Sequence, residues 1–448
     1  MTTNTLKSDI TAIVGDANIT FEAAALASGS KDSFHFSPVL LEDLDGKSAD
    51  LIVRPETQAQ LVEIVRYAVA NRIPITPRGA GTGNYGQGVP MQGGILVNTK
   101  KLNRIIELTS DYARVECGTV LWQIEKQAAQ VGAELRIFPS TMPTSSSAGF
   151  ITGGSGGVGS ITWGMLSDNN NVRAVKALTI EAEPQVLELT TPEEIRDVLH
   201  NCGVTAFVTE VEFALAPKTQ WHQYAFAFDD LYSALAAGEK LAHNTHILKR
   251  LCSVFEWPIP SFFLPLVKKE ACPEGKALLL LMCNLEPSEL VAQLGDFDGR
   301  LTFHAPPVEE SGRGFQIYDF TWNHTTMWAM KTDKQYTYLQ DSFDKDNYME
   351  QLRARKAKYG DQVLTHVEFL QSNGEIRPGG LSLVHYQSRE QLFGLIDYCE
   401  SIGMRISNPH THFLDADIRW YGDYLLAARK RWDPNSLLNP GHLRALEE

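Results

Sequence analysis

Two glycine-rich segments constrain the fold of this chain more than any other feature of its sequence. The first, residues 78–84, follows a strand predicted at 73–76. The second, residues 149–160, has six glycines in twelve positions, and it also carries Phe150 and Ile151, which a flexible spacer does not need. Glycine lets backbone N–H groups approach a ligand closely, and consecutive N–H groups form a concavity that suits a pyrophosphate. The pair therefore predicts two ordered loops that hold a dinucleotide from both sides.

The spacing of the first segment is not specific by itself. A tight structural turn explains Gly79-x-Gly81-x-Gly83 equally well. The segment also lacks the G-x-G-x-x-G spacing, which argues against NAD bound by a Rossmann domain.

Short strands and helices alternate around these loops. A strand at 51–53 precedes a helix that begins at Thr57, where Gln60 has the spacing of a capping box. The following predicted elements are strands at 94–97, 113–117, 175–180 and 207–215 and a helix at 121–131 that ends at Gly132.

We expect an α+β chain of several parts. The residues Ala216-Pro217-Lys218 indicate a domain boundary, and beyond it a strand at 277–283 and a helix at 388–402 indicate a second α+β domain. The predicted parts are an N-terminal helical segment at 1–45, a first domain at 46–218, a second domain at 219–418 and a C-terminal segment at 419–448 that returns to the first domain.

Charge and cysteine content exclude several classes of function. A net charge of −14, without clusters of Lys and Arg, argues against nucleic-acid binding. The six cysteines are scattered, without a C-x-x-C pair for zinc or an iron–sulfur cluster, and we predict no metal site. No apolar run is long enough to cross a bilayer, and the first 20 residues lack the features of a signal or transit peptide. We expect a cytoplasmic protein without an integral membrane segment.

The order of further motifs resembles a known family. The sequence is similar to FAD-binding domains of the PCMH type, which belong to the vanillyl-alcohol oxidase superfamily. The matching motifs occur in the family's order, at Val53 to Thr57, Pro77 to Gly83, Phe138 to Thr141, Ala148 to Ile161, Trp163-Gly164, Gly203 to Glu210 and Trp432 to Gly441.

The resemblance implies a two-subdomain PCMH-type FAD-binding domain at 46–218, with an α+β cap domain at 219–418 that binds the substrate. Several members attach FAD covalently through a histidine near the position where this chain has Gly81 and Thr82, so we expect noncovalent FAD. The residues implied to bind it are Arg78, Gly79, Ala80, Gly81, Thr82, Gly83, Asn84, Pro139, Ser140, Thr141, Gly149, Thr152, Gly153, Gly154, Gly157, Gly159, Ser160, Phe207, Val208 and Asn439.

Within that family the chain looks most like the glycolate oxidase catalytic subunit and flavin-linked D-lactate dehydrogenases. The resemblance implies hydride transfer from a small 2-hydroxy acid to the flavin N5, while a basic residue takes the hydroxyl proton. Two features of those relatives are missing. The tryptophan motif with an arginine for the substrate carboxylate reads Trp322-Asn323-His324-Thr325 here, and the histidine motifs that hold a metal have only partial counterparts at 379–385 and 408–412.

The candidate catalytic residues are His410, His412 and His324. In an extended segment, His410 and His412 point to the same side and reach one ligand together. Capping of a turn or pairing with a nearby acid explains these two histidines nearly as well, and a packed core position explains His324 equally well. Candidate replacements for the missing arginine are Arg313, Arg377 and Arg419, and Tyr318 and Tyr421 are further residues of the same region.

Three hypotheses for the function follow. The first is oxidation of a 2-hydroxy acid such as D-lactate or glycolate, with an unknown electron acceptor. The second is oxidation of a non-acidic alcohol or sugar-like substrate, because the anchoring arginine is missing. The third is a noncatalytic flavin-binding subunit of a complex like glycolate oxidase.

Overall fold

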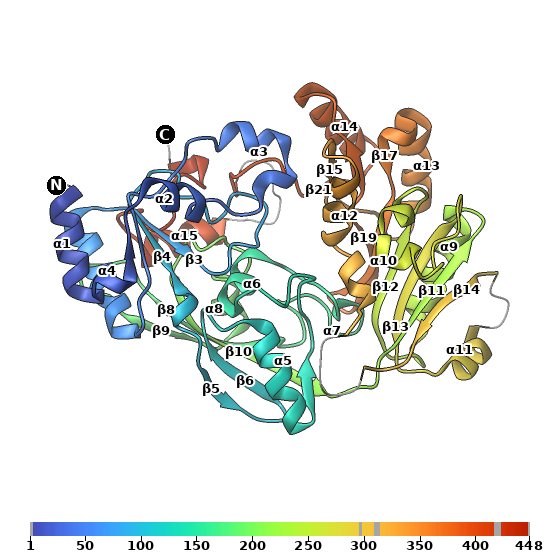
Figure 1. Cartoon of the computed structure of the whole chain (residues 1–448), viewed down its shortest axis with the longest axis horizontal. Coiled ribbons are helices and arrows are strands. Elements are labelled where there is room, and N and C mark those ends of the chain that lie inside the picture. The colour runs from blue at the N-terminus through green and yellow to red at the C-terminus, as the bar shows by residue number, and fades with distance from the viewer. Residues whose placement is uncertain (1–2, 295–297, 309–313, 416–422, 447–448) are drawn as a thin grey trace.

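Four β-sheets organise the chain in the computed structural model, which describes residues 3–294, 298–308, 314–415 and 423–446. A four-stranded and a six-stranded sheet form the N-terminal half, shown in blue to green in Figure 1. An eight-stranded sheet and a small three-stranded sheet form the other half, shown in yellow to orange. The protein therefore has the α+β architecture that the sequence predicts.

The four-stranded sheet has the order β1-β2-β4-β3, and its last three strands are parallel. Its strands are β1 (Ile19–Thr20), β2 (Leu51–Val53), β3 (Ile75–Arg78) and β4 (Ile95–Asn98). Helix α4 (Gln58–Asn71) connects β2 to β3, which is the usual connection between parallel strands. Its apolar stripe is buried, and helix α1 (Thr3–Val14) packs beside it.

Thr57 caps α4, as its spacing to Gln60 predicts. Its hydroxyl oxygen accepts the N–H of Gln60 at 3.2 Å. The Gln60 side chain, however, accepts the N–H of Glu56 at 2.7 Å rather than that of Thr57. The cap thus satisfies two backbone donors at the start of the helix, but its second bond is displaced by one residue.

The six-stranded sheet is antiparallel and is built around its longest strand, β10 (Phe207–Pro217). Residues of β10 alternate between the core and a charged outer face, so that Val211 is buried while Glu210 pairs with Arg114 at 2.9 Å. The other strands are β5 (Ile105–Leu108), β6 (Tyr112–Glu116), β7 (Ala133–Leu135), β8 (Val172–Leu178) and β9 (Val186–Leu189), and the helices beside them are α5 (Leu121–Ala128) and α8 (Pro192–Arg196). Gly132, predicted to end the helix before β7, has the expected left-handed conformation, with φ 73°.

The eight-stranded sheet of the cap half is covered on both faces. Its strands, in order across the sheet, are β14 (Arg300–Ala305), β11 (His222–Phe228), β13 (Ala277–Cys283), β12 (Lys249–Phe255), β18 (His366–Ser372), β19 (Glu375–Gly380), β16 (Asp341–Ser342) and β21 (Arg405–Ile406). One face packs against α9 (Leu231–His243), α13 (Tyr348–Tyr359) and α14 (Arg389–Ser401). The other face packs against α10 (Leu264–Val267) and α12 (His324–Thr332) and against the N-terminal half. The small sheet joins β15 (Tyr336–Tyr338), β20 (Leu383–His385) and β17 (Val363–Leu364), in that order.

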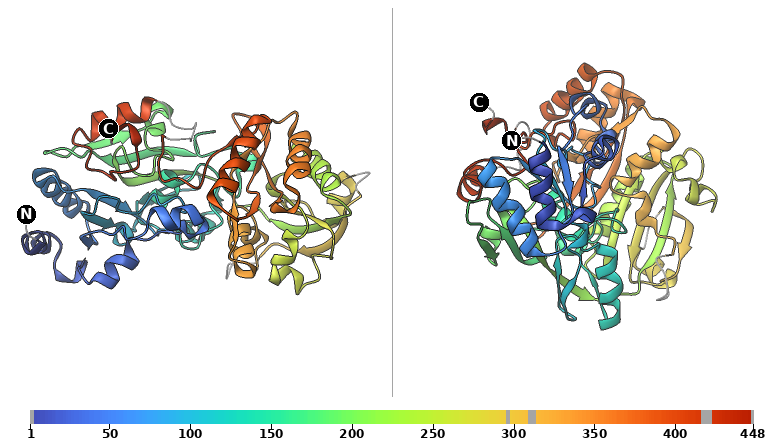
Figure 2. Two further views of the ribbon diagram at one scale, coloured as in Figure 1. Left: turned by 90° about the horizontal axis from the view of Figure 1, so that it is seen from above. Right: turned by 60° about the vertical axis from the view of Figure 1, so that its left-hand side comes forward.

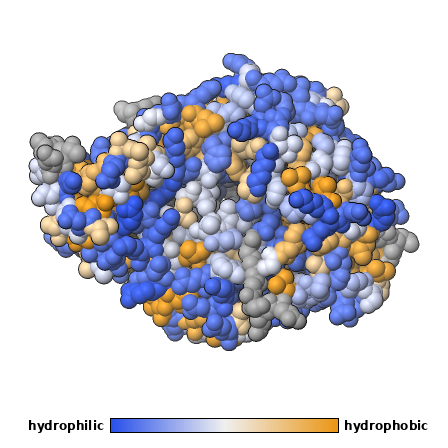
Figure 3. All heavy atoms as spheres, in the orientation of Figure 1, coloured by the Kyte–Doolittle hydropathy of each residue, from blue (hydrophilic) through white to orange (hydrophobic). Residues whose placement is uncertain are grey.

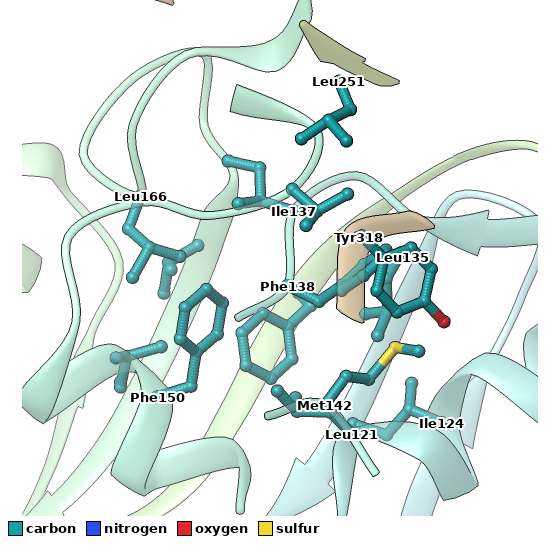
Figure 4. Close-up of a cluster of buried hydrophobic side chains, with 14 of the residues drawn as sticks. Leu121, Ile124, Leu135, Ile137, Phe138, Met142, Phe150, Leu166, Leu251 and Tyr318 are labelled. Atoms are coloured by element: carbon teal, nitrogen blue, oxygen red, sulfur yellow. The ribbon is translucent and has the colours of Figure 1, made fainter. Parts of the chain in front are cut away.

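The two halves share one hydrophobic core. Figure 4 shows Phe138 of the N-terminal half between Phe150 of the same half and Tyr318 of the cap half, with Leu251 of β12 nearby. Phe138 and Tyr318 meet edge to face, with ring centroids 5.3 Å apart. Because the core runs through the junction, the position of the cap relative to the glycine loops is fixed by packing.

A buried ionic network reinforces this junction. Arg250 of β12 reaches into the N-terminal half, where its guanidinium lies 3.1 Å from Glu125 and 3.5 Å from Glu134. The same guanidinium stacks over the ring of Phe138 at 4.7 Å, and the indole N–H of Trp221 donates to Glu134 at 3.0 Å. The network pairs charges that are otherwise costly to bury.

The described part of the C-terminal segment lies against the N-terminal half. Figure 2 shows helix α15 (Asp423–Trp432), in red, against the green and blue elements rather than on the cap. The Ile180 N–H donates to the Trp432 carbonyl at 2.7 Å, and Ile75 of β3 exchanges backbone hydrogen bonds with Leu437 and Asn439.

The surface is polar over most of the face shown in Figure 3, where hydrophobic residues form small separate groups among hydrophilic ones. Among the described residues, none of the helices combines the length and the apolar character needed to cross a membrane.

Candidate functional site

A cavity of about 440 Å³ lies where the glycine loops of the N-terminal half face the cap. The loop after β3 and the start of α6 (Ser147–Gly153) line one side, and α12 with the turn before it lines another. Cavities of this size at the junction of two halves are typical of ligand sites.

The first glycine segment presents bare backbone at its three glycines, where a side chain has no room. A Cβ at Gly79 would overlap the Ser146 hydroxyl, and Gly81 has φ 72°, which L residues rarely adopt. The loop leaves β3 at Arg78 and lies against the cavity through all its residues from Arg78 to Asn84.

The second glycine segment is more ordered than the loop that the sequence suggests, because it begins within a helix. Ser146 caps α6 by accepting the Gly149 N–H at 3.3 Å, and the same hydroxyl approaches Gly79 of the first segment. Gly153 and Gly154 then lie at the cavity. The two glycine segments therefore meet, and together they form one wall.

Sixteen of the residues predicted to bind the cofactor line this cavity. They are Arg78, Gly79, Ala80, Gly81, Thr82, Gly83, Asn84, Pro139, Ser140, Thr141, Gly149, Thr152, Gly153, Gly154, Phe207 and Val208.

The four other predicted residues do not line it, and their contacts show how they support it. A Cβ at Gly157 would overlap the Phe138 carbonyl, and a Cβ at Gly159 would overlap the Arg136 carbonyl, so both glycines pack behind the loop. The Ser160 hydroxyl accepts the Gly157 N–H at 3.0 Å, before α7 (Ser160–Trp163).

Asn439, the fourth of these residues, lies behind the cavity wall and forms hydrogen bonds to two residues that line it. Its side-chain amide donates to the carbonyls of Gln87 and Cys202, at 2.8 Å each. Gln87 and Cys202 both line the cavity. The C-terminal segment therefore holds two parts of the wall together.

The Arg78 side chain forms hydrogen bonds to the backbone of neighbouring loops. Its guanidinium donates to the carbonyl of Gly88 at 2.9 Å and to the carbonyl of Lys31. Among the described lining residues it is the only arginine or lysine. The cavity thus lacks an uncommitted guanidinium or ammonium group in the part of the chain that the structure describes.

Asp32 lies beside Arg78 at the same wall. Its carboxylate accepts the N–H groups of Phe34 at 2.9 Å and Gly88 at 3.3 Å. Burial raises the pKa of Asp32 to about 6, although the charge of Arg78 acts in the opposite direction. An acid that titrates this close to neutral pH is typical of functional sites.

The N-terminal segment contributes to the cavity, which sequence reasoning missed. Asp32, Ser33, His35 and Phe36 line it, and the Ser33 N–H donates to the Gly83 carbonyl at 2.7 Å. No motif marks these residues. The only local signal is a turn-forming composition, which predicts a loop but not its position.

The cap side of the cavity is neutral and partly aromatic. It comprises Trp322, Asn323, His324, Met327, Gln340 and Leu381. The Gln340 amide donates to the hydroxyl of Tyr85, which comes from the glycine-loop side. Of the three predicted catalytic histidines, His324 is the one that lines this cavity.

His410 and His412 lie elsewhere. His410 is 1% exposed, and its ring nitrogens lie 2.8 Å from the Ser37 hydroxyl and 2.9 Å from the Tyr338 carbonyl. His412 lines a second, adjoining cavity of about 20 Å³, which has room for about one water molecule and shares Tyr85 and Gln340 with the main cavity. Burial lowers the pKa of each to about 4, so both are neutral at physiological pH. The structure does not bring the two histidines together with His324.

Two of the candidate anion anchors, Arg313 and Arg419, and the candidate Tyr421 lie outside the described residues. Arg377 lies on β19 and donates to Glu375 at 2.7 Å, away from the cavity lining. Tyr318 is 4% exposed and packs on Phe138. Within the described ranges, no three His, Cys, Asp or Glu side chains are grouped to hold a metal ion.

Comparisons with known proteins agree on the cofactor-binding half. The model of the family described as FAD binding domain matches residues 49–202. An uncharacterised FAD-linked oxidoreductase of Mycobacterium tuberculosis is 25% identical over 197 residues, which are 42% of this chain and 42% of that protein. The glycolate oxidase subunit GlcD of Bacillus subtilis is 21% identical over 432 residues, which are 88% of this chain and 89% of that protein.

Among solved structures, an alkyldihydroxyacetonephosphate synthase has a TM-score of 0.74 at 16% identity, covering 98% of this chain and 84% of that one. This likeness extends over both halves and shows that the whole fold, including the cap, occurs in another protein.

Proposed function

We propose that this chain, which carries a PCMH-type FAD-binding domain over residues 49–202, is an FAD-dependent oxidoreductase that acts on a CH–OH donor. One observation carries the proposal. The backbone wall built from both glycine segments shares a single cavity with the polar and aromatic cap residues. A dinucleotide and a small substrate therefore have adjoining places in one site.

The residues present fit FAD. Gly79 and Gly149 both lie against the Ser146 hydroxyl, so a side chain at either position would collide with Ser146 and displace this part of the cavity wall. We propose that the backbone N–H groups of 79–84 hold the pyrophosphate, with Gly153 and Gly154 beside it, and that Pro139 to Thr141 and Phe207-Val208 line the rest of the cofactor site. Nothing in this wall requires a covalent bond, and we propose noncovalent attachment.

Bound FAD would supply the hydride acceptor for the substrate's α-carbon. The chain's own residues supply the remaining functions. We propose that His324 takes the hydroxyl proton, and that Asn323 and Gln340 orient the substrate through hydrogen bonds. Trp322, Met327 and Leu381 exclude water from the reacting atoms.

Two substrate classes follow from different observations. Similarity to the Bacillus subtilis glycolate oxidase subunit along most of the chain supports a small 2-hydroxy acid. The charge of the cavity supports an uncharged alcohol or sugar-like donor, because Arg78 is committed to the backbone and the other described lining residues include no second arginine or lysine.

The experiment is an anaerobic titration of the FAD-loaded protein, followed by bleaching of the flavin absorbance. Bleaching by D-lactate or glycolate supports the first class, and bleaching only by uncharged alcohols supports the second. A flavin that neither set reduces refutes the oxidoreductase and leaves a noncatalytic flavin-binding subunit. His324→Ala should retain FAD and slow bleaching at least a hundredfold, whereas His412→Ala, outside the cavity, should slow it far less.

We also infer a cytoplasmic location. None of the six cysteines forms a disulfide, and five of them are buried. Six thiols outside disulfides suit a reducing compartment. Labelling of the unfolded protein isolated from cells would count six thiols if this is correct, and fewer if disulfides form.

A further inference from the structure

A buried carboxyl group lies behind the cap wall of the cavity. Glu368 lies on β18 in the middle of the cap sheet, and it is only 1% exposed although it is an acidic residue. It accepts the backbone N–H of Trp322 at 2.8 Å and the Ser253 hydroxyl, and its other neighbour is His366 Nε2 at 2.9 Å. Three polar groups thus surround one carboxyl in a region otherwise packed with apolar side chains.

The register of the sheet brings these groups together. Ser253 lies directly opposite Glu368 in the ladder between β12 and β18, and Phe255 lies opposite His366. His366 and Glu368 are two residues apart in a strand, so their side chains share a face. The His366 ring stacks on Phe255, with centroids 4.5 Å apart, which holds the imidazole toward the carboxyl.

The residue that Glu368 holds has an unfavourable backbone conformation. Trp322 has φ 51°, a left-handed value that a bulky residue rarely adopts and that persists only when its surroundings enforce it. Such conformations concentrate where side chains contact ligands. Trp322 and the next two residues, Asn323 and His324, all line the cavity.

Resting on the oxidoreductase function proposed above, we propose that Glu368 is a positioning residue of this site. Its hydrogen bond to the Trp322 N–H fixes the left-handed turn, and the turn directs Trp322, Asn323 and His324 into the cavity. Glu368 itself does not line the cavity, and it acts through the turn. The hydrogen bond ties Glu368 to a strained residue of the cavity wall, so loss of this bond should change the shape of the wall as well as the stability of the cap.

Three variants of the FAD-loaded protein test this role. Glu368→Ala removes the acceptor, Glu368→Asp withdraws the carboxyl from Trp322 by one methylene group, and Glu368→Gln keeps an amide oxygen for the Trp322 N–H. The matched control is Glu256→Gln, because Glu256 is also a buried cap residue and accepts a backbone N–H, that of Thr365 at 2.7 Å, but Thr365, unlike Trp322, does not line the cavity.

The first readout is hydrogen exchange of the segment 317–327, measured by mass spectrometry. Glu368→Ala and Glu368→Asp should each raise exchange at Trp322 at least tenfold, while Glu368→Gln and Glu256→Gln should leave it within threefold of the unmodified protein. Unchanged exchange in Glu368→Asp overturns the proposal. This readout needs no substrate, so it stands even if no donor reduces the flavin and the proposed function fails.

The second readout is the limiting rate of anaerobic flavin reduction by whichever of D-lactate, glycolate or an uncharged alcohol reduces the unmodified protein. Glu368→Asp should lower that rate at least tenfold at full FAD content, and Glu368→Gln should restore it to within threefold. A role in stability alone would lower Tm in Glu368→Asp and leave the limiting rate of the folded protein unchanged, and that result also overturns the proposal.

Discussion

Asp32→Asn should stabilise the FAD-free protein at alkaline pH. The pKa of Asp32 is raised from 3.8 in the unfolded chain to about 6 in the folded protein, so ionisation of this carboxyl is less favourable in the folded state. The contribution of Asp32 to the free energy of unfolding is therefore fully present below pH 3.8 and is lost as the pH rises through 6. The difference between the two values corresponds to about 3 kcal/mol, because one pKa unit is worth about 1.4 kcal/mol. Asp32 is partly exposed to the cavity, so solvent screening makes this value an upper bound.

The substitution also has a cost. An asparagine amide replaces one of the two oxygens that accept the Phe34 and Gly88 N–H groups, which costs about 1 kcal/mol. The net gain at pH 8 is therefore about 2 kcal/mol, and it becomes a loss below pH 4. Since roughly half of the titration effect has already occurred at pH 5, the advantage of the variant should grow by about 1.5 kcal/mol between pH 5 and pH 8.

Urea unfolding of both FAD-free proteins at pH 5 and pH 8, followed by fluorescence, measures this change. Asp230→Asn is the control, because hydrogen bonds from Ser233 lower the pKa of Asp230 and confine its titration to pH values below 5. The control's difference from the unmodified protein should therefore be the same at both pH values. A difference for Asp32→Asn that also stays constant refutes the placement of Asp32 in a desolvated site.

Three further substitutions test the supports of the site. Arg250→Ala leaves the buried Glu134 and the partly buried Glu125 without their cation, and should lower the free energy of unfolding by about 3–5 kcal/mol; a loss below about 1 kcal/mol in urea titrations would show that the network is dispensable. Gly94→Ala places a Cβ against the Pro74 carbonyl at a residue with φ 76° and should cost more than about 1 kcal/mol, whereas a rise in Tm would contradict the geometry. Asn439→Ala removes two hydrogen bonds to the cavity wall and should weaken FAD binding roughly tenfold in fluorescence titrations, unless the wall holds its shape without the C-terminal segment.

The sequence predicts local elements well where a local signal is complete. Thr57 and Gln60 locate the start of α4, Gly132 locates the end of the helix before β7, and an uninterrupted apolar run gives β13 its limits at 277 and 283. These signals depend on backbone geometry within a few residues, so they do not require knowledge of distant contacts.

The wall formed by the glycine segments is also predictable from local backbone geometry. Glycine at Gly79 and Gly81 is required by a close approach and by a left-handed φ, both of which a motif records. The second segment was harder to predict, because the helix α6 begins within a stretch whose composition favours a loop.

The candidate catalytic histidines show what sequence alone leaves open. His410 and His412 share a short motif, yet His410 packs against Ser37 and Tyr338 while His412 lies at the small adjoining cavity. His324 lines the main cavity, although the sequence fits a core histidine at this position equally well.

The glycine segments by themselves determined that this chain brings its backbone close to a ligand, because the constraint they meet is one of backbone conformation. Their order with the further motifs indicated FAD, through the resemblance to PCMH-type domains. Tertiary structure alone decided which side chains face the cavity. Asp32 reaches it through contacts with residues some fifty positions away, and Trp322 is held there by Glu368 from another strand. Such contacts depend on how separate elements pack, and no local pattern encodes that.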